Sequence, residues 1–180
     1  GGRAFWFAGP SGSGKTTLAR IVAGEVADTL NVNEFDAGDL TNDRLEQTVR
    51  AMRCYGIGAK AGHACIINEA HGLRKETIRR LLTVLEEIRP HCVWCFTTTS
   101  EGERGLFEAK IDAHPLLSRC IEVPMRKFNL TEAFAKRAME IARTEGLDGQ
   151  PLSAYIALAN ECKSNLRQML QRIEAGGMLT

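Results

Sequence analysis

The sequence predicts an α/β fold: a three-layer sandwich with a parallel five-stranded sheet, followed by a small C-terminal helical domain. Three observations predict it. Over residues 1–124, short apolar runs alternate with stretches of helical periodicity, which is typical of a parallel sheet covered by helices. A glycine-rich segment joins the first apolar run to the first helical stretch. After Pro124 only helical periodicity remains, so we expect one domain over residues 1–124 and a helical domain over residues 125–180.

Each expected element follows from its local pattern. The expected strands are the short apolar runs at residues 4–8, 32–36, 64–68, 92–97 and 120–123. Apolar residues at intervals of three and four predict helices at 15–27, at 42–53, before Pro90, and at 131–144, 152–161 and 165–174. Pro90 ends the third of these. Thr131 and Ser164 are the expected caps of the first and last C-terminal helices.

The bulk composition excludes several classes of protein. Of 180 residues, 44% are hydrophobic and 25% are charged, which is ordinary for a globular domain with its own core. The net charge of +1 gives no overall basic field for nucleic acid. No apolar run approaches the length of a membrane span, and no signal-peptide pattern is present.

The six cysteines are scattered, which predicts a reduced, cytoplasmic setting. Cys92 and Cys95 form a C-x-x-C, a spacing that zinc and redox sites share. They fall on an expected strand, however, where residues three apart point to opposite faces. We therefore predict a buried strand here and no metal site at these thiols.

The glycine-rich segment carries the strongest functional signal. It matches the phosphate-binding pattern G-x-x-x-x-G-K-[ST] in full and lies between a strand and a helix. Its residues are Gly9, Pro10, Ser11, Gly12, Ser13, Gly14, Lys15 and Thr16, with Thr17 next. Such a loop surrounds phosphates with backbone N–H groups at a helix N-terminus. We expect ATP with Mg²⁺: Lys15 at the β- and γ-phosphates, and the Thr16 hydroxyl at the metal.

A second motif follows the third apolar run, where Asn68 and Glu69 end the strand. Ligands of open α/β sheets bind at this edge. A carboxylate normally assists Mg²⁺ here, and a following Glu polarises the attacking water. Glu69 fits the second role, whereas Asn68 places a neutral amide at the metal. The amide predicts weaker Mg²⁺ retention and slower hydrolysis. The alternative is that both residues only cap the next segment.

With these motifs, three further segments resemble a known family. The chain also contains Thr97-Thr98-Thr99 at a strand end, Leu117-Ser118-Arg119-Cys120, and Asn165-Leu166-Arg167, in that order. Together they resemble a P-loop NTPase of the AAA+ type, most closely the ATP-binding subunits of DNA polymerase clamp loaders. These are the replication factor C small subunits and the bacterial DNA polymerase III gamma/tau type. The similarity extends over nearly the whole chain and identifies residues 125–180 as the lid.

The resemblance implies roles for individual residues. Thr98, with Thr97 and Thr99 as alternatives, is similar to sensor 1, which touches the γ-phosphate or the attacking water. Arg119 is similar to the arginine finger, which acts on ATP bound by a neighbouring subunit. Arg167 resembles sensor 2, which reaches phosphates from the lid. The implied partners are other AAA+ subunits, a sliding clamp and primed DNA.

The chain also departs from the family's pattern. Asn68 replaces the usual Asp, the linker over residues 99–115 is long, and the zinc-binding cysteine cluster of many bacterial relatives is absent. The adenine-enclosing segment before the first strand and the collar domain lie outside these residues, so we expect a part of a longer protein. DNA contact by Lys75, Arg79 and Arg80 competes with a solvated, salt-bridged helix face, in which Glu76 pairs with Arg80.

Two hypotheses follow. The first is a clamp-loader-like ATPase module in which Lys15, Thr16 and Glu69 act in cis and Arg119 acts on a neighbour. The second is a nucleotide-binding structural subunit that hydrolyses little because of Asn68. A small-molecule kinase, which the glycine-rich loop alone allows, leaves the other motifs unexplained.

Overall fold

The computed structural model describes residues 2–99, 106, 113–125 and 130–179. Contacts divide the chain into two compact units. The first contains Gly1–Gly9 and Lys15–Pro124, and the second contains Pro10–Gly14 and Met125–Thr180. Because these units are defined by contacts alone, the division into domains at residues 1–124 and 125–180 stays a prediction.

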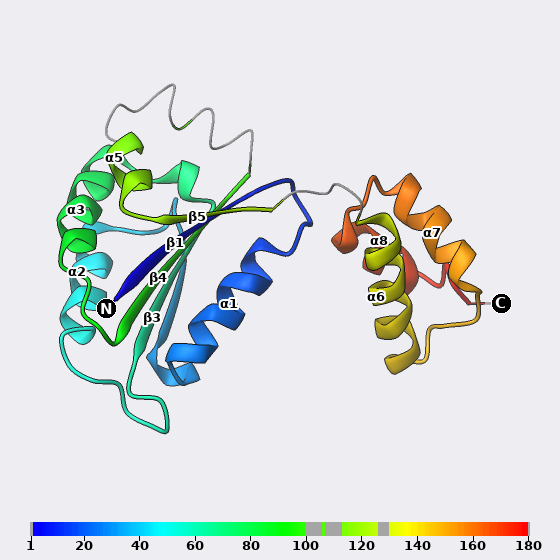
Figure 1. The fold of residues 1–180 in the computed structure, drawn as a ribbon, viewed down its shortest axis with the longest axis horizontal. Coiled ribbons are helices and arrows are strands. Elements are labelled where there is room, and N and C mark those ends of the chain that lie inside the picture. Colours follow the sequence, from blue (N-terminus) through cyan, green and yellow to red (C-terminus); the bar gives the residue numbers. More distant parts are fainter. Residues whose placement is uncertain (1, 100–105, 107–112, 126–129, 180) are drawn as a thin grey trace. The chain divides into compact units, whose positions relative to one another are not determined.

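Five parallel strands form the sheet of the first unit, in the order β2-β3-β4-β1-β5 (Figure 1). They are β1 (Arg3–Ala8), β2 (Val32–Asp36), β3 (His63–Asn68), β4 (Cys92–Thr98) and β5 (Ile121–Pro124). Every strand end lies within one residue of its predicted position. The parallel five-stranded sheet is therefore confirmed.

Helices cover both faces of this sheet. Helix α1 (Lys15–Val26) packs against β3 and β4 on one face, and α2 (Asn42–Ala51), α3 (Lys75–Glu86) and α5 (Ala113–Ser118) lie over the other (Figure 1). Two short 3₁₀ helices, η1 (Thr29–Asn31) and η2 (Ala70–Gly72), precede β2 and α3. The three-layer arrangement agrees with the predicted fold class.

Helix α5 was not predicted from the sequence, and it contains a proline. In the structure Pro115 lies in the first turn of α5. A proline is tolerated there because the N–H that it lacks has no helical partner anyway. The predicted linker over residues 99–115 falls mostly outside the described residues, so its length stays untested.

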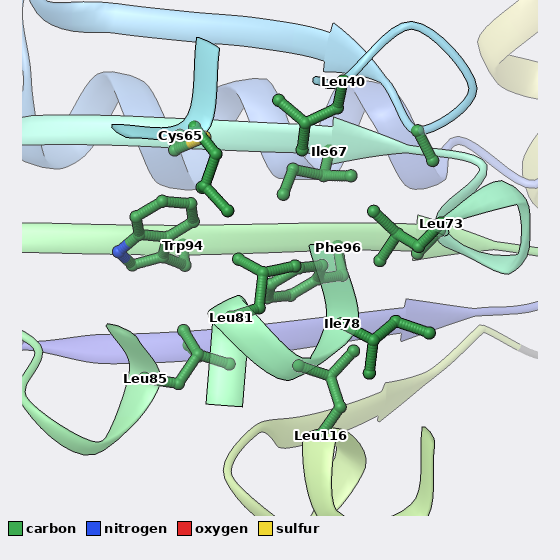
Figure 2. Close-up of a cluster of buried hydrophobic side chains, with 14 of the residues drawn as sticks. Leu40, Cys65, Ile67, Leu73, Ile78, Leu81, Leu85, Trp94, Phe96 and Leu116 are labelled. Atoms are coloured by element: carbon green, nitrogen blue, oxygen red, sulfur yellow. The ribbon is translucent and has the colours of Figure 1, made fainter. Parts of the chain in front are cut away.

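The main core lies between the sheet and the layer of α2, α3 and α5. Ile67, Trp94 and Phe96 from the strands meet Ile78 and Leu81 from α3 (Figure 2). Alternate residues of a strand point to opposite faces, so Trp94 and Phe96 face this core and Cys95 between them faces α1. Burial of each large side chain contributes about 1.5–3 kcal/mol, and this core fixes the strand ends that carry the site.

The second unit has its own small core. Helices α6 (Thr131–Thr144), α7 (Leu152–Glu161) and α8 (Leu166–Glu174) pack around Ala138, Tyr155 and Met169, which are fully buried. The Tyr155 hydroxyl donates a hydrogen bond of 2.9 Å to Asp148 Oδ1. Burial, with this bond to a carboxylate, raises the pKa of Tyr155 to about 12.

Both predicted caps in this unit are wrong by one residue. Helix α6 starts after Leu130, which makes no side-chain capping bond. Asn165, not Ser164, caps α8, because its side chain accepts a hydrogen bond of 3.3 Å from the Gln168 N–H. Ser164 instead shares a hydrogen bond of 3.2 Å with the Thr131 hydroxyl. The two hydroxyls bond to each other, so neither satisfies a helix terminus.

Candidate functional site

Most predicted site residues lie at one edge of the sheet. Strands β3, β4 and β1 are adjacent and parallel, so their carboxyl ends meet at the same edge. Asn68 ends β3, Thr98 ends β4, and the glycine-rich loop follows Ala8 at the end of β1. Crevices at such carboxyl edges are the usual ligand sites of open α/β sheets.

The loop turns sharply from β1 into α1 by means of two glycines. Gly12 and Gly14 have φ angles of +71° and +89°, in the region that side chains with a Cβ rarely adopt. At Gly14 a Cβ would find open space, so the requirement there is conformational rather than steric. Gly9 begins the loop, and its N–H donates a hydrogen bond of 3.3 Å to the Thr98 carbonyl of the adjacent strand β4.

Two polar groups of the loop are buried. Lys15, at the first position of α1, is only 7% exposed, and its Nζ donates to the Gly9 carbonyl over 3.0 Å. The Ser13 hydroxyl is buried without a hydrogen-bond partner among the residues that the structure describes. An unsatisfied hydroxyl at a helix N-terminus, close to the ammonium group of Lys15, suits a polar ligand. The loop therefore fits an anionic group such as a phosphate.

A hydrogen-bonded cluster joins this loop to β3 and β4. The hydroxyls of Thr16 and Thr97 each donate to Asn68 Oδ1 over 3.0 Å. Thr97 Oγ1 also accepts from the Glu69 N–H over 3.4 Å. Because the Thr16 hydroxyl gives its hydrogen to Asn68, its oxygen keeps lone pairs for a cation. Hydroxyl and amide oxygens suit Mg²⁺, although the amide brings no charge.

The sequence reasoning missed two charged residues behind Asn68. Glu34 of β2 accepts a hydrogen bond of 2.7 Å from Asn68 Nδ2. Its two carboxylate oxygens also accept two bonds of 2.9 Å from the guanidinium of Arg20 on α1. The hydrogen bonds from Arg20 lower the pKa of Glu34, with a further contribution from Asn68, against the opposing effect of burial. No local pattern around residue 34 could have identified it, since both partners are distant in sequence.

Glu69 is held in an unusual backbone conformation. Its φ of 51° and ψ of 47° lie in the left-handed region, which costs a residue with a side chain about 1 kcal/mol or more. Its carboxylate lies 3.5 Å from His71 Nδ1, and that nitrogen lies 3.2 Å from the Thr98 hydroxyl. The backbone turn thus brings Glu69, His71 and Thr98 together. His71 was not predicted as a site residue.

Arg119 is engaged within its own chain. Its NH1 donates to the Pro115 carbonyl over 2.8 Å, and its NH2 pairs with Glu86 at the end of α3. Its Nε is buried without a hydrogen-bond partner among the described residues. The predicted role of Arg119 at the nucleotide of a neighbouring subunit stays a prediction.

The remaining predicted residues lie in the loop, after β4 and in the second unit. Thr17 and Ser11 are exposed and Pro10 is half-buried. The Thr99 carbonyl accepts a hydrogen bond of 3.3 Å from the Thr98 hydroxyl. Arg167 is exposed in the first turn of α8, in the second unit. The predicted roles of these residues stay predictions.

The comparison with protein families decides the assignment. The model of the ATPase family associated with various cellular activities (AAA) matches residues 5–123, which is more than half of the chain. The chain belongs to the AAA family. The loop, the Asn68 cluster and Glu69 all lie within the matched region.

The AAA chain is similar to two named proteins. It is 27% identical over 192 residues to DNA polymerase III subunit gamma/tau from Mycoplasma genitalium, with 93% of the chain and 30% of the relative aligned. Solved structures of Thermotoga maritima RuvB share the fold. A threonine-to-valine variant has a TM-score of 0.72 at 21% identity, and a RuvB structure described as a Holliday junction branch migration motor has a TM-score of 0.69 at 21%. In both, the match covers 96% of this chain and 53% of RuvB.

The chain therefore spans only part of each of these relatives. It aligns with about a third of gamma/tau and about half of RuvB. The comparisons support nucleotide binding in an AAA fold. The activities and assemblies of the longer relatives come to this chain only as proposals.

The basic face of α3 in the AAA chain differs from the prediction. Lys75 and Arg79 are exposed, as a face for solvent or phosphate requires. Arg80 pairs with Glu46 of the neighbouring helix α2 rather than with Glu76. The guanidinium binds both oxygens of Glu46 and lowers the pKa of that carboxyl. The predicted Glu76–Arg80 pair is wrong because packing between helices offers Arg80 a two-pronged partner.

The C-x-x-C of the AAA chain is part of the buried sheet. Cys92 and Cys95 are free thiols on β4, and burial raises their pKa values to about 11 and 12. Within the described residues there is no group of three or more His, Cys, Asp or Glu side chains that could hold a metal. Among those residues, too, no helix has the length and apolar character to cross a bilayer.

A separate cavity of about 510 Å³ lies at the opposite edge of the sheet. It is lined by the ends of α2 and α3 and by the start of β4, including Met52, Arg89 and Cys92. Because parallel strands begin at this edge, the cavity is remote from the glycine-rich loop. It contributes nothing to the candidate site.

Proposed function

We propose that this chain is the ATP-binding and ATP-hydrolysing module of a clamp-loader-like AAA+ assembly that acts in DNA replication. The Thr16–Asn68 hydrogen bond carries the proposal, because it joins the phosphate loop to the strand end where Glu69 follows. The similarity to DNA polymerase III gamma/tau supports the replication context. On this proposal residues 1–124 form the nucleotide-binding core and residues 125–180 form the lid.

Each residue has a defined task in the proposed reaction. Backbone N–H groups of the loop and the Lys15 ammonium bind the β- and γ-phosphates. Thr16 and Asn68 hold Mg²⁺, which neutralises phosphate charge when bound. Glu69 accepts a hydrogen bond from the attacking water and orients it, and Thr98 fixes the water or γ-phosphate from the adjacent strand.

By resemblance, two arginines complete the site in the assembly. Arg119 acts on the ATP of a neighbouring AAA+ subunit, and Arg167 acts on the phosphates of its own. Fixed cations at developing phosphoryl charge are worth about 10³–10⁵ in rate in related enzymes. The further partners on this proposal are a sliding clamp and primed DNA.

The binding step is tested by titrating a fluorescent ATP analogue into the wild-type chain and Lys15→Ala. We expect the affinity to fall by about tenfold to a hundredfold, since a hydrogen bond to a charged group contributes about 1.5–3 kcal/mol. Lys136→Ala is the matched control, because Lys136 is exposed on α6 and pairs with Glu132. Equal affinities of wild type and Lys15→Ala would overturn the proposal.

The hydrolysis step is tested with Glu69→Gln in a single-turnover assay of phosphate release. We expect release to be lost while the affinity for ATP stays within about twofold, because an amide cannot take up the proton of the water. Glu87→Gln, on an exposed residue after α3, is the control for a lost carboxylate. Unchanged phosphate release from Glu69→Gln would contradict the role of Glu69.

The second candidate is a nucleotide-binding structural subunit with little hydrolysis. The neutral amide of Asn68 favours it, because it brings no charge to Mg²⁺. Recovery of intact ATP after long incubation with the wild-type chain and Mg²⁺ would favour this candidate, whereas phosphate release that depends on Glu69 would exclude it.

A further inference from the structure

A chain of three side chains crosses the α1 face of the sheet behind the proposed metal site. The Arg20 guanidinium holds both oxygens of Glu34, and Glu34 Oε1 accepts from Asn68 Nδ2 over 2.7 Å. In the register of β2 and β3, Glu34 is opposite Ile66, two residues before Asn68 on the same face. Glu34 therefore binds the nitrogen of the Asn68 amide, while the Thr16 and Thr97 hydroxyls bind its oxygen.

The chemistry of these groups permits one orientation of the Asn68 amide. An ionised carboxylate can only accept hydrogen bonds, so the atom that faces Glu34 must be the amide nitrogen. The carbonyl oxygen then faces the hydroxyls of Thr16 and Thr97, which both donate to it. If the amide turned over, two acceptor oxygens would face each other at the distance of the present hydrogen bond, which is repulsive.

We propose that Glu34, held by Arg20, is a positioning residue that keeps the Asn68 carbonyl oxygen directed at Thr16 and the metal site. The inference rests on the proposed function for its consequence at Mg²⁺, though not for the orientation of the amide. An amide oxygen serves as a ligand or accepts from metal-bound water, whereas an amide NH₂ does neither. Loss of Glu34 thus weakens Mg²⁺ retention without removing any group that touches the metal.

The same geometry makes a carboxylate at position 68 unfavourable. The substitution Asn68→Asp would place two carboxylates at hydrogen-bonding distance, where one must stay protonated or both must move apart. Arg20 offsets this only in part, because its side chain is 64% exposed and well screened. Asn68 and Glu34 therefore act as a unit, and restoring the family's usual Asp requires a change at Glu34 too.

The experiment compares the wild type with Glu34→Ala, Asn68→Asp and the double variant Glu34→Ala/Asn68→Asp. Glu25→Ala, on an exposed residue of the last turn of α1, is the control for a lost surface carboxylate. The first measurement is the NMR signal of the Asn68 side-chain NH₂ in the nucleotide-free chain, assigned by its absence from Asn68→Asp. The second is the ratio of ATP affinities with Mg²⁺ and with a chelator.

The expected results separate the two measurements. One NH₂ proton of Asn68 should shift upfield in Glu34→Ala and stay in place in Glu25→Ala, because only the former loses the charged acceptor. The Mg²⁺-dependent gain in affinity should fall about three- to tenfold in Glu34→Ala. It should change less than about threefold in Asn68→Asp, and rise by about tenfold or more in the double variant.

Two outcomes would overturn the proposal. One is an unchanged Asn68 signal in Glu34→Ala, which means that Glu34 does not orient the amide. The other is a gain of Mg²⁺ dependence in Asn68→Asp alone that equals the gain of the double variant. If no variant binds nucleotide at all, the proposed function fails, and the consequence at Mg²⁺ fails with it. The NMR comparison then still decides whether Glu34 orients Asn68.

Discussion

Asn68 links the loop, the neighbouring strand and a charged pair through one amide group. Its oxygen accepts from two threonines, and its nitrogen donates to Glu34. The residue could be singled out from sequence because it follows an apolar run and precedes Glu69. Its partner on β2 could not, because the order of strands decides which side chains lie behind it.

The cysteines give a prediction at the same scale. Cys54 is exposed, whereas burial raises the thiol pKa values of Cys65, Cys92 and Cys95. Because the thiolate is the reactive form, we expect one fast equivalent with Ellman's reagent at pH 8 and the remaining thiols only on unfolding. Cys54→Ser should remove the fast phase; a fast phase that survives this substitution would show that one of the other thiols, which are buried or half-buried, is accessible.

His63 gives a prediction about pH. It is only 8% exposed, its Nδ1 lacks a hydrogen-bond partner among the described residues, and burial, with nearby His91, lowers its pKa. The unfolded chain therefore binds a proton at higher pH than the folded one. The free energy of unfolding should be steady above the ordinary histidine pKa and fall as the pH drops toward the folded value.

Urea midpoints between about pH 5 and pH 7.5, where an ordinary histidine titrates, measure this decline. His63→Gln stays neutral throughout, so its midpoints should show a shallower slope than those of the wild type. Identical slopes in the two proteins would contradict the assignment to His63.

At the scale of elements, local sequence patterns predicted most boundaries of helices and strands. They did not predict the features that depend on tertiary contacts. The ranges of β2, α6 and α7 agree with the prediction at both ends, because apolar periodicity and flanking turns are local signals. The two predicted caps were wrong because the side chains of Thr131 and Ser164 bond to each other across two helices. Helix α5 was not predicted. Its Pro115 lies in the first turn, where a proline is tolerated, although proline breaks a helix in most other positions.

The contact between α3 and α5 carries a prediction about Arg119. Its side chain is tied to Glu86 and to the Pro115 carbonyl. If Arg119 acts on a neighbouring subunit, Glu86→Ala releases it and should raise ATP turnover of the assembled protein by a few-fold. Arg119→Ala should lower that turnover by about 10³-fold or more. Neither should change the ATP affinity of the isolated chain by more than about twofold.

Concentration dependence supplies the control for this prediction. The effects on turnover should vanish when the protein is diluted to monomers, because the arginine acts between subunits. An effect of Arg119→Ala that persists in the monomer would mean that Arg119 works within its own chain. Glu87→Ala, which removes the adjacent exposed carboxylate, should leave turnover unchanged.

At the scale of the whole molecule, two separate apolar clusters stabilise the chain. Leu81 belongs to the cluster beside the sheet and Met169 to the cluster of α6, α7 and α8, and both are fully buried. Helical spacing in the sequence predicted the helices whose apolar faces contribute to these clusters. The sequence carried no information on the order of the strands, since apolar runs in a parallel sheet have no register signal of their own.

Truncation of either core should have local effects. Leu81→Ala and Met169→Ala each remove a buried side chain and should lower the free energy of unfolding of their own unit by about 2–5 kcal/mol. Hydrogen exchange monitored by mass spectrometry should show lost protection over β3, β4 and α3 in the first variant, and over α6, α7 and α8 in the second. Protection lost uniformly across both units would mean that they unfold as one.

The strand order has a consequence for the synthesis of the protein on the ribosome. β1 lies between β4 and β5, so its apolar Phe5, Trp6 and Phe7 pair only with segments that begin at residues 92 and 121. During translation β1 is made before either of its neighbours, and it is enclosed last. Such long-range pairing is slow and leaves apolar, aggregation-prone surface exposed until it is complete. The nascent chain thus has a long interval in which β1 is not covered by its neighbouring strands.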